Sequence, residues 1–134
     1  ELMHRFRAEQ YRALRGGAHE LTHLEGKVLG YFAEHPGATQ KTLADRSGRD
    51  KGQLARLIGG LRERGLLDAQ ADEADRRNLR LQPTAAGRAV HRALQRRLRD
   101  VSQQAIATLS APERMQLLAL LQRLDAGLRD GDAS

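Results

Sequence analysis

The sequence predicts a mainly α-helical protein with one small β-hairpin near its middle. Hydrophobic residues make up 40% of the 134 residues but aromatic residues only 3%, so the apolar content is mostly Leu, Ala, Ile and Val, which favours helices. Apolar residues recur at helical spacing along most of the chain. Residues 66–82 are different, because there two short segments resembling half-buried strands flank a polar loop. The length suits one domain.

The composition excludes several classes of protein. There are no cysteines, which excludes disulfides, cysteine-ligated zinc and direct sensing by thiol oxidation. The longest apolar runs fall far short of the roughly 18 residues that span a bilayer. Residues 1–14 are charged throughout and lack the apolar segment of a secretion signal. We therefore expect a cytoplasmic protein without a membrane role.

The helices are expected in order along the chain, each with its own start or stop signal. A first helix with Leu2, Met3, Phe6 and Leu14 on one side ends at Gly16-Gly17. Thr22 and Glu25 form a capping box that starts a second helix, which Pro36-Gly37 stops. Thr39 caps a short helix over residues 40–46. After the turn Ser47-Gly48-Arg49, Asp50 caps a further helix that ends at Gly65.

Residues 39–64 have the pattern of a helix-turn-helix, in which a Gly-containing turn joins two short helices and the small Ala44 lets them approach. In the second helix Leu54, Leu57, Ile58 and Leu61 take the inner face. Lys51, Gln53 and Arg56 then point outward, and these residue types read base edges in a major groove. The alternative is an ordinary helical hairpin with a polar exterior.

The predicted hairpin pairs residues 66–70 with residues 78–82, and Pro83 ends its second strand. A β-ribbon directly after a recognition helix is the wing of a winged helix. Its tip carries Arg76 and Arg77, which suit the negative potential of a minor groove. We interpret Asp75 as a residue that orients these arginines. The alternative is a solvated hairpin tip without a ligand.

Two further helices are expected after the hairpin. Thr84 caps a long helix that reaches roughly residue 109, and its Val90, Leu94, Leu98, Val101 and Ala105 form a narrow apolar seam. Residues 110–113, Ser-Ala-Pro-Glu, start the last helix. Its leucines cover more than half of its circumference, which a small monomer cannot bury, so the pattern favours a dimer. A compact monomeric helical core is the alternative.

The charge favours a polyanionic partner. Lys and Arg number 23 against 17 Asp and Glu, giving a net charge of +6. Eight arginines and no carboxylate lie between Arg76 and Arg99. Charge alone does not choose between DNA, RNA and a membrane surface, although the last lacks the bulky apolar face that interfacial helices use.

The order and spacing of several stretches between Leu21 and Gly87 resemble the MarR (multiple antibiotic resistance regulator) family of transcription factors. The matching stretches are Leu21-Thr22 with Glu25 and Val28-Leu29; Pro36-Gly37 with Thr39-Gln40 and Leu43-Ala44; Asp50-Lys51-Gly52 with Leu54 and Arg56; Leu61 with Arg64-Gly65-Leu66; and Asp75-Arg76-Arg77, Leu79, Leu81, Thr84 and Gly87. Two places depart from the family pattern. At Asp68-Ala69-Gln70 the family usually has a basic residue, whose loss would remove a salt-bridge partner for Asp75. At Pro83 it usually has an apolar residue, and the proline weakens the end of the strand.

This resemblance implies a winged helix-turn-helix flanked by N- and C-terminal dimerisation helices. It implies a homodimeric repressor of a pseudopalindromic operator on double-stranded DNA, with Arg77 in the minor groove. A small aromatic or anionic ligand between the dimer helices and the DNA-binding lobe would regulate it. We expect one domain over residues 1–134, with residues 22–83 as the DNA-binding lobe and residues 1–17 and 84–134 forming the dimer.

These inferences define the predicted site residues. The major groove would be contacted by Lys51, Gln53 and Arg56, the minor groove by Arg76 and Arg77 with Asp75 as orienting residue, and the phosphates by Thr39, Gln40, Lys41 and Arg49. Gly52 also belongs to the predicted DNA-binding set. The dimer interface would include Leu2, Phe6, Leu117, Leu121, Leu124 and Leu128. No cofactor and no enzymatic activity are expected. Gly59 and Gly60 lie within the expected recognition helix, where each should cost roughly 1 kcal/mol relative to Ala, and either close packing or a softer helix would explain them.

A competing motif is His19-Glu20-Leu21-Thr22-His23, which matches the zinc-peptidase pattern H-E-x-x-H. That chemistry requires both histidines on one helical face, whereas Thr22 is predicted to be an N-cap, so that a helix would begin between them. A regulatory metal bound by His19 and His23, with His4 or His91, is a second alternative. Neither displaces the DNA-binding interpretation.

Overall fold

The computed structural model describes residues 1–6, 8 and 21–132. Two compact units make up the chain, Glu1–Arg99 and Asp100–Ser134. Residues 2–6 are helical, as the apolar stripe predicts, whereas Leu14, Gly16 and Gly17 of the same prediction lie outside the described residues. In the described part of the chain, no helix is both long and apolar enough to cross a membrane.

Three helices of the first unit begin at the residues that the sequence marks as caps. Helix α2 (His23–Glu34) starts with the predicted capping box, because Thr22 Oγ1 accepts from the Glu25 N–H and Glu25 Oε1 accepts from the Thr22 N–H, both at 3.2 Å. Helix α3 (Gln40–Ser47) starts at Thr39. In α4 (Lys51–Glu63) the Asp50 carboxylate accepts from the Gly52 N–H at 2.7 Å.

Glycines in the left-handed backbone region end these helices abruptly. Gly48 follows α3 with φ of +65°, and Gly65 follows the end of α4 with φ of +72°. A residue with a Cβ would be strained at either position. The turn at Gly48 sets the angle between α3 and α4, and Gly65 sends the chain from α4 directly into the sheet.

The sheet has three antiparallel strands rather than the two predicted. Strands β2 (Leu67–Ala71) and β3 (Leu79–Pro83) form the expected hairpin, each displaced by one residue from its predicted bounds. The additional strand β1 (Ala38–Thr39) pairs with Leu81 and Arg80, giving the order β1-β3-β2. Pro83 lies within β3 instead of after it. Because β1 does not extend that far, the missing N–H leaves the three-stranded part intact.

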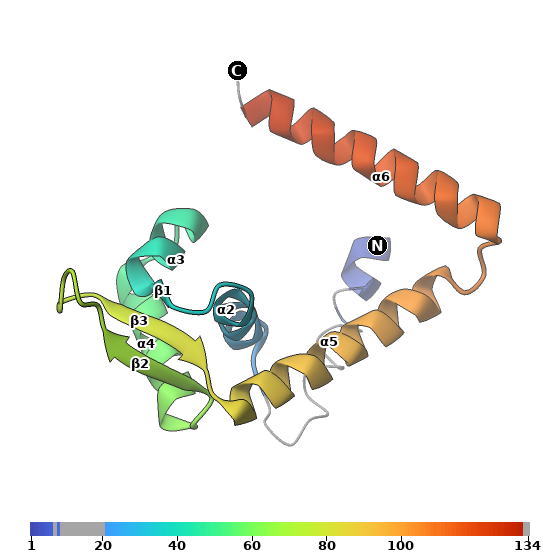
Figure 1. Ribbon diagram of the computed structural model, residues 1–134. Helices are drawn as coiled ribbons and strands as arrows, with labels where there is room; N and C mark the ends of the chain where they lie inside the picture. The colour runs from blue at the N-terminus through green and yellow to red at the C-terminus, as the bar shows by residue number, and fades with distance from the viewer. Residues whose placement is uncertain (7, 9–20, 133–134) are drawn as a thin grey trace. The chain divides into compact units, whose positions relative to one another are not determined.

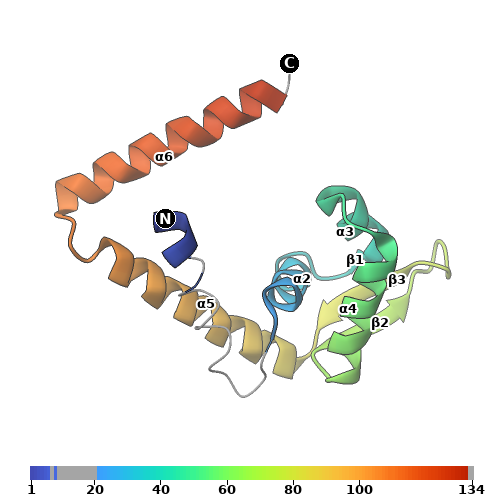
Figure 2. The ribbon, with the colours of Figure 1, turned by 180° about the vertical axis from the view of Figure 1, so that it is seen from behind.

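The hydrophobic core joins α2 and α4 to the sheet. Its fully buried side chains come from every layer: Leu29, Phe32, Leu54, Leu61, Leu66, Leu67 and Leu81. In both opposite views α4 lies against the sheet, and the loop between β2 and β3 extends beyond the helices (Figures 1 and 2). Burial of one face of α4 therefore presents the opposite face to solvent beside the hairpin.

Two long helices complete the chain. Helix α5 (Ala85–Ile106) ends three residues before the predicted position, and α6 (Ala111–Asp132) follows. The predicted start of α6 is confirmed, because the Glu113 carboxylate accepts from the Ser110 N–H at 2.8 Å and Ser110 Oγ accepts from the Glu113 N–H at 3.3 Å. Hydrogen bonds from the Ser110 backbone N–H, first, and from the Ser110 side chain lower the pKa of the Glu113 carboxyl group below its ordinary value.

Candidate nucleic-acid interface

The N-terminal half of α4 presents polar side chains to solvent. Leu54, Ile58 and Leu61 are buried against the core, which turns the other face of the helix outward. Lys51 and Arg56 are exposed, and Gln53 is half-buried at the edge of the apolar face. The helix therefore carries an amide and two cations in its first two turns, the donor types that pair with purine edges in a major groove.

Helix α3 is joined to the start of α4 by a side chain as well as by the turn. The Gln40 amide donates to the Lys51 carbonyl at 3.4 Å. Thr39 Oγ1 accepts from the Thr42 N–H at 3.1 Å and lies 2.8 Å from Thr42 Oγ1. Lys41 is exposed beside them. Of the four residues predicted to contact phosphate, Thr39 and Gln40 thus also hold the motif together.

The loop between β2 and β3 carries Arg76 and Arg77 into solvent, with the Arg77 side chain 94% exposed. Asp75 accepts from the Arg77 N–H at 3.0 Å and lies 3.5 Å from Arg77 Nε. This geometry is what an orienting role for Asp75 requires, and it comes from a local contact. The departure at residues 68–70 therefore does not leave Asp75 without an arginine partner.

The base of the same loop is held by a pair that the sequence analysis did not identify. The Asp72 carboxylate accepts from the Ala74 N–H at 3.3 Å and from Arg80 Nε at 3.1 Å. These contacts, that with Ala74 first, lower the pKa of Asp72 below its ordinary value. The pair could have been found from the hairpin register, because the pairing of Ala71 with Leu79 brings Asp72 near Arg80.

A second ion pair that the sequence analysis did not identify ties the end of α4 to α2. Arg64 Nη1 donates to Glu25 Oε2 at 2.9 Å, while Glu25 Oε1 still serves the capping box with Thr22. One carboxylate therefore joins the start of α2 to the last turn region of α4. The Glu25 side chain is 18% exposed and the Arg64 side chain 33%, so solvent and salt screen the pair in part.

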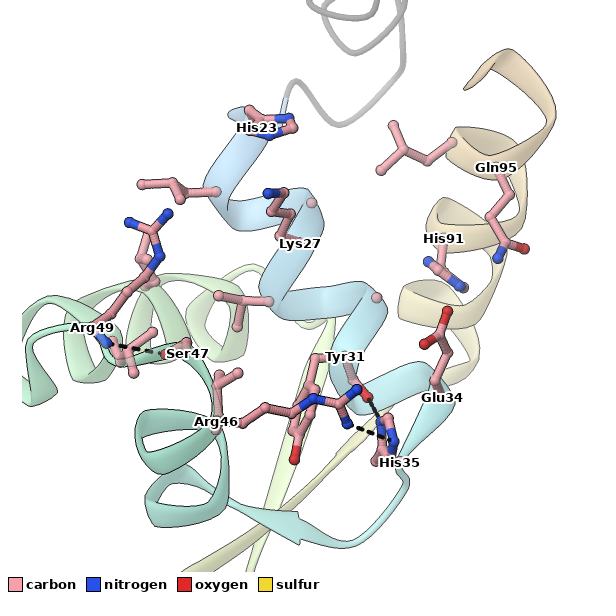
Figure 3. Close-up of a pocket in the computed structure, with 18 of the residues that line it drawn as sticks. His23, Lys27, Tyr31, Glu34, His35, Arg46, Ser47, Arg49, His91 and Gln95 are labelled. Atoms are coloured by element: carbon pink, nitrogen blue, oxygen red, sulfur yellow. Dashed lines mark hydrogen bonds between the residues drawn. The ribbon is translucent and has the colours of Figure 1, made fainter. Parts of the chain in front are cut away.

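A groove of about 1080 Å³ lies over α2, bordered by α3, α4 and α5; below it is called the α2 groove (Figure 3). Its apolar lining includes Leu24, Val28, Leu57 and Leu94. The charged and ionisable residues that line it are Lys27, Arg46, Arg49, Glu34, His23, His35 and His91. Among these described residues cations outnumber carboxylates three to one, so the groove favours an anion with an apolar body.

One wall of the α2 groove is a cluster of ring systems. The Tyr31 and His35 rings stack with centroids 4.6 Å apart, and the Arg46 guanidinium lies 5.8 Å from the Tyr31 ring centroid. His35 Nδ1 donates to the Tyr31 carbonyl at 3.1 Å. The other ring nitrogen, His35 Nε2, accepts from Arg46 Nη1 at 3.3 Å, because a guanidinium can only donate. Arg46 is therefore already held by protein groups.

Comparison with known proteins agrees with this geometry. The MarR family model matches residues 19–78. A protein of Thauera aromatica named as a transcriptional regulatory protein for the hcr operon is 31% identical over 134 residues, covering 92% of this chain and 78% of the relative. The chain belongs to the MarR family. It is a DNA-binding transcriptional regulator of that family, as the resemblance in the sequence implied.

Solved structures of MarR-type regulators share the fold. The crystal structure of Streptococcus pneumoniae FabT in complex with DNA superposes with a TM-score of 0.83 at 21% identity, covering 96% of this chain and 91% of that one. The PcaV regulator of Streptomyces coelicolor, solved with its natural ligand, has a TM-score of 0.69 at 31% identity, covering 93% and 89%. The predicted fold class, mainly helical with a small winged sheet, is confirmed.

The zinc-peptidase motif does not fit this MarR-family fold. Helix α2 begins at His23, and Leu21 and Thr22 before it are not helical, so that no single helix runs through residues 21–23 as that motif requires. His19 itself lies outside the described residues. Among the residues that the structure describes, no group of three metal-ligating side chains surrounds His23 or His91. The comparisons give no support to a peptidase.

Proposed function

We propose that this MarR-family protein is a homodimeric repressor that binds a pseudopalindromic operator and is released by a small aromatic or anionic ligand. The observation that carries the proposal is the pairing of two exposed features on one lobe. Lys51 and Arg56 project from the outer face of α4, and Arg76 and Arg77 project from the wing. Together they suit simultaneous contact with a major and a minor groove.

Each side chain has a role that follows from its chemistry. Gln53 suits pairing with adenine and Arg56 with guanine, while Lys51 and the Gly52 backbone lie at the helix start, where the helix dipole favours an anion. Arg77, positioned by Asp75, suits the narrow minor groove. Thr39, Gln40 and Lys41 lie at the start of α3 and Arg49 lies in the turn before α4, and all four suit phosphate contacts that set the register.

Exposed leucines on α6 support a dimer. Leu121, Leu124 and Leu128 are 52%, 66% and 73% exposed, and Leu117 is at 36%. Leu2 in the N-terminal helix is 79% exposed, and Phe6 is half-buried. A soluble monomer rarely leaves such a continuous apolar face in water. Residues 1–17 and 84–134 would then form a two-fold interface that spaces the recognition helices by about 34–36 Å, one turn of DNA.

The dimer is tested by substitution of Leu124→Asp, with Arg123→Asp on the neighbouring polar position as the control for added negative charge. Sedimentation equilibrium of the wild type should give twice the chain mass. Leu124→Asp should shift the protein toward monomer at micromolar concentration, whereas Arg123→Asp should not. A wild-type protein that sediments as a monomer would contradict the homodimer.

DNA recognition is tested by fluorescence anisotropy with duplexes from the gene's own upstream region and with unrelated duplexes, at about 50 and 200 mM salt. Arg77→Ala should weaken specific binding by roughly 1–3 kcal/mol and reduce the salt dependence by about one unit of slope. Arg62→Ala is the control, because it removes one positive charge from an exposed residue at the far end of α4. It should leave DNA binding within about twofold of wild type.

The outcomes of this experiment are distinct. Specific affinity that persists at the higher salt and depends on Arg77 but not on Arg62 supports the operator-binding role. Equal affinity for every duplex, with loss at higher salt, would indicate only electrostatic attraction and contradict sequence-specific recognition. Equal losses in the two variants would contradict a role for the wing.

A further inference from the structure

Arg49 lies at the junction of the DNA-facing surface and the α2 groove. It stands two residues before α4, in the turn that follows Gly48, and its N–H donates to Ser47 Oγ at 3.3 Å. Its side chain lines the α2 groove and extends from the turn alongside α2 (Figure 3). The residue that is predicted to hold an operator phosphate thus already faces the site in which a ligand would bind.

The guanidinium of Arg49 is available to an anion. It forms no ion pair or hydrogen bond with another side chain in the described part of the chain, and the residue is exposed. Arg46, on the same wall, is instead engaged with His35 and Tyr31. Lys27 also lacks an ion-pair partner among the described residues. An anion entering the α2 groove would therefore meet Arg49 and Lys27 first.

We propose that a carboxylate ligand in the α2 groove competes with operator phosphate for Arg49, so that ligand binding withdraws a DNA-contacting cation. The inference rests on the proposed function, since it concerns the same DNA and ligand sites. A guanidinium that pairs bidentately with a ligand carboxylate has its single positive charge neutralised and its donors turned into the groove, so it attracts an operator phosphate less strongly. The apolar wall of Leu24, Val28 and Leu57 would hold the body of the ligand.

This mechanism makes Arg49 different from the other predicted phosphate contacts. Lys41 is also exposed near the start of the DNA-binding motif, but it does not line the α2 groove. Loss of either cation should weaken DNA binding. Only loss of Arg49 should also weaken the effect of the ligand on DNA binding, because direct competition requires a residue that both ligands use.

The experiment uses the full chain, the specific duplex found above, and benzoate as the anionic probe. Benzamide is the neutral control of the same shape, and sodium chloride matches the ionic strength. Anisotropy gives the Kd for DNA with and without saturating benzoate for the wild type, Arg49→Gln and Lys41→Gln. Calorimetry without DNA measures benzoate binding separately.

In the wild type, benzoate should raise the DNA Kd by a factor within roughly 5–150, the usual range of coupling between sites, and benzamide should not. Lys41→Gln should weaken DNA binding while keeping that factor. Arg49→Gln should reduce the factor by which benzoate raises the DNA Kd to about twofold or less. The same variant should bind benzoate roughly tenfold more weakly, because it loses a charge-assisted pair.

Three results would overturn the inference: an unchanged factor in Arg49→Gln, equal effects of benzoate and benzamide, or no binding of benzoate to the free wild-type protein. In each of these the specific duplex would still bind without ligand, so operator recognition would stand. A wild-type protein that binds no duplex specifically would instead contradict the proposed function, and the competition with it.

Discussion

Gly87 is a position at which a single added methyl group should destabilise the fold. A Cβ built there would lie 2.0 Å from the Leu66 carbonyl oxygen and 3.0 Å from its carbonyl carbon. Ordinary contact begins at about 3.4 Å, so α5 and the start of β2 must separate by about 1.4 Å. Since the obstacle is backbone, no side-chain rotation relieves it.

That separation would also stretch the contacts that fix the start of α5. The Thr84 N–H donates to the Leu66 carbonyl at 3.1 Å and Thr84 Oγ1 donates to the Gly65 carbonyl at 2.6 Å. Overpacking costs about 1–3 kcal/mol, and each lost hydrogen bond about 0.5–1.5 kcal/mol. We expect Gly87→Ala to cost about 3–4 kcal/mol, which lowers the Tm by about 10 °C for a chain of this size.

Calorimetry at one fixed protein concentration measures this effect, because unfolding of an oligomer depends on concentration. Gly59→Ala is the matched control: its added Cβ meets nothing within 4 Å, so it should instead stabilise α4 by about 1 kcal/mol. If Gly87→Ala unfolds within about 2 °C of wild type, the reasoning from this contact is wrong.

Two further predictions concern the local contacts of the lobe. Thr22→Ala removes the side-chain half of the α2 capping box and should cost about 1 kcal/mol in the free energy of unfolding, measured by urea titration; an unchanged midpoint would contradict the role of the cap. Asp72→Ala should increase amide exchange of the wing at neutral pH. Because the Ala74 N–H and Arg80 lower the pKa of Asp72 from 3.8, the ionised form supports the wing, and the wild-type wing should lose this support as the pH falls below that value. A wing whose exchange follows only the intrinsic pH dependence, and is the same in Asp72→Ala, would refute this.

Much of the fold was predictable because its signals are local. The caps at Thr22, Thr39 and Asp50 depend on a few neighbouring residues, and each is found as predicted. The strand β1 was missed because a two-residue strand has no periodicity to detect. Its pairing exists only because Gly37 turns the chain so that its N–H meets the Leu81 carbonyl at 2.8 Å.

The candidate site, like the fold, was predictable from sequence only where its signals are local. The outward position of Lys51 and Arg56 follows from helical periodicity once the leucines of α4 are assigned to the core. Helical periodicity does not predict the contacts Asp72–Arg80 and Glu25–Arg64. Their residues are 8 and 39 positions apart in the sequence, respectively. A Cβ added at Gly59 or Gly60 would have no neighbouring atom within 4 Å, so close packing does not explain why these positions are glycines.

The sequence by itself determined the order of the helices, the helix-turn-helix with its wing, the polyanionic preference and the family. These follow from periodicity, capping residues, turn glycines and charge, all of which act over a few residues or over the whole chain. Only the tertiary structure decided which distant residues meet. It placed the α2 groove between segments far apart in the chain, required a glycine at residue 87 and brought Arg49 to the edge of that groove, because burial of the shared core sets these distances.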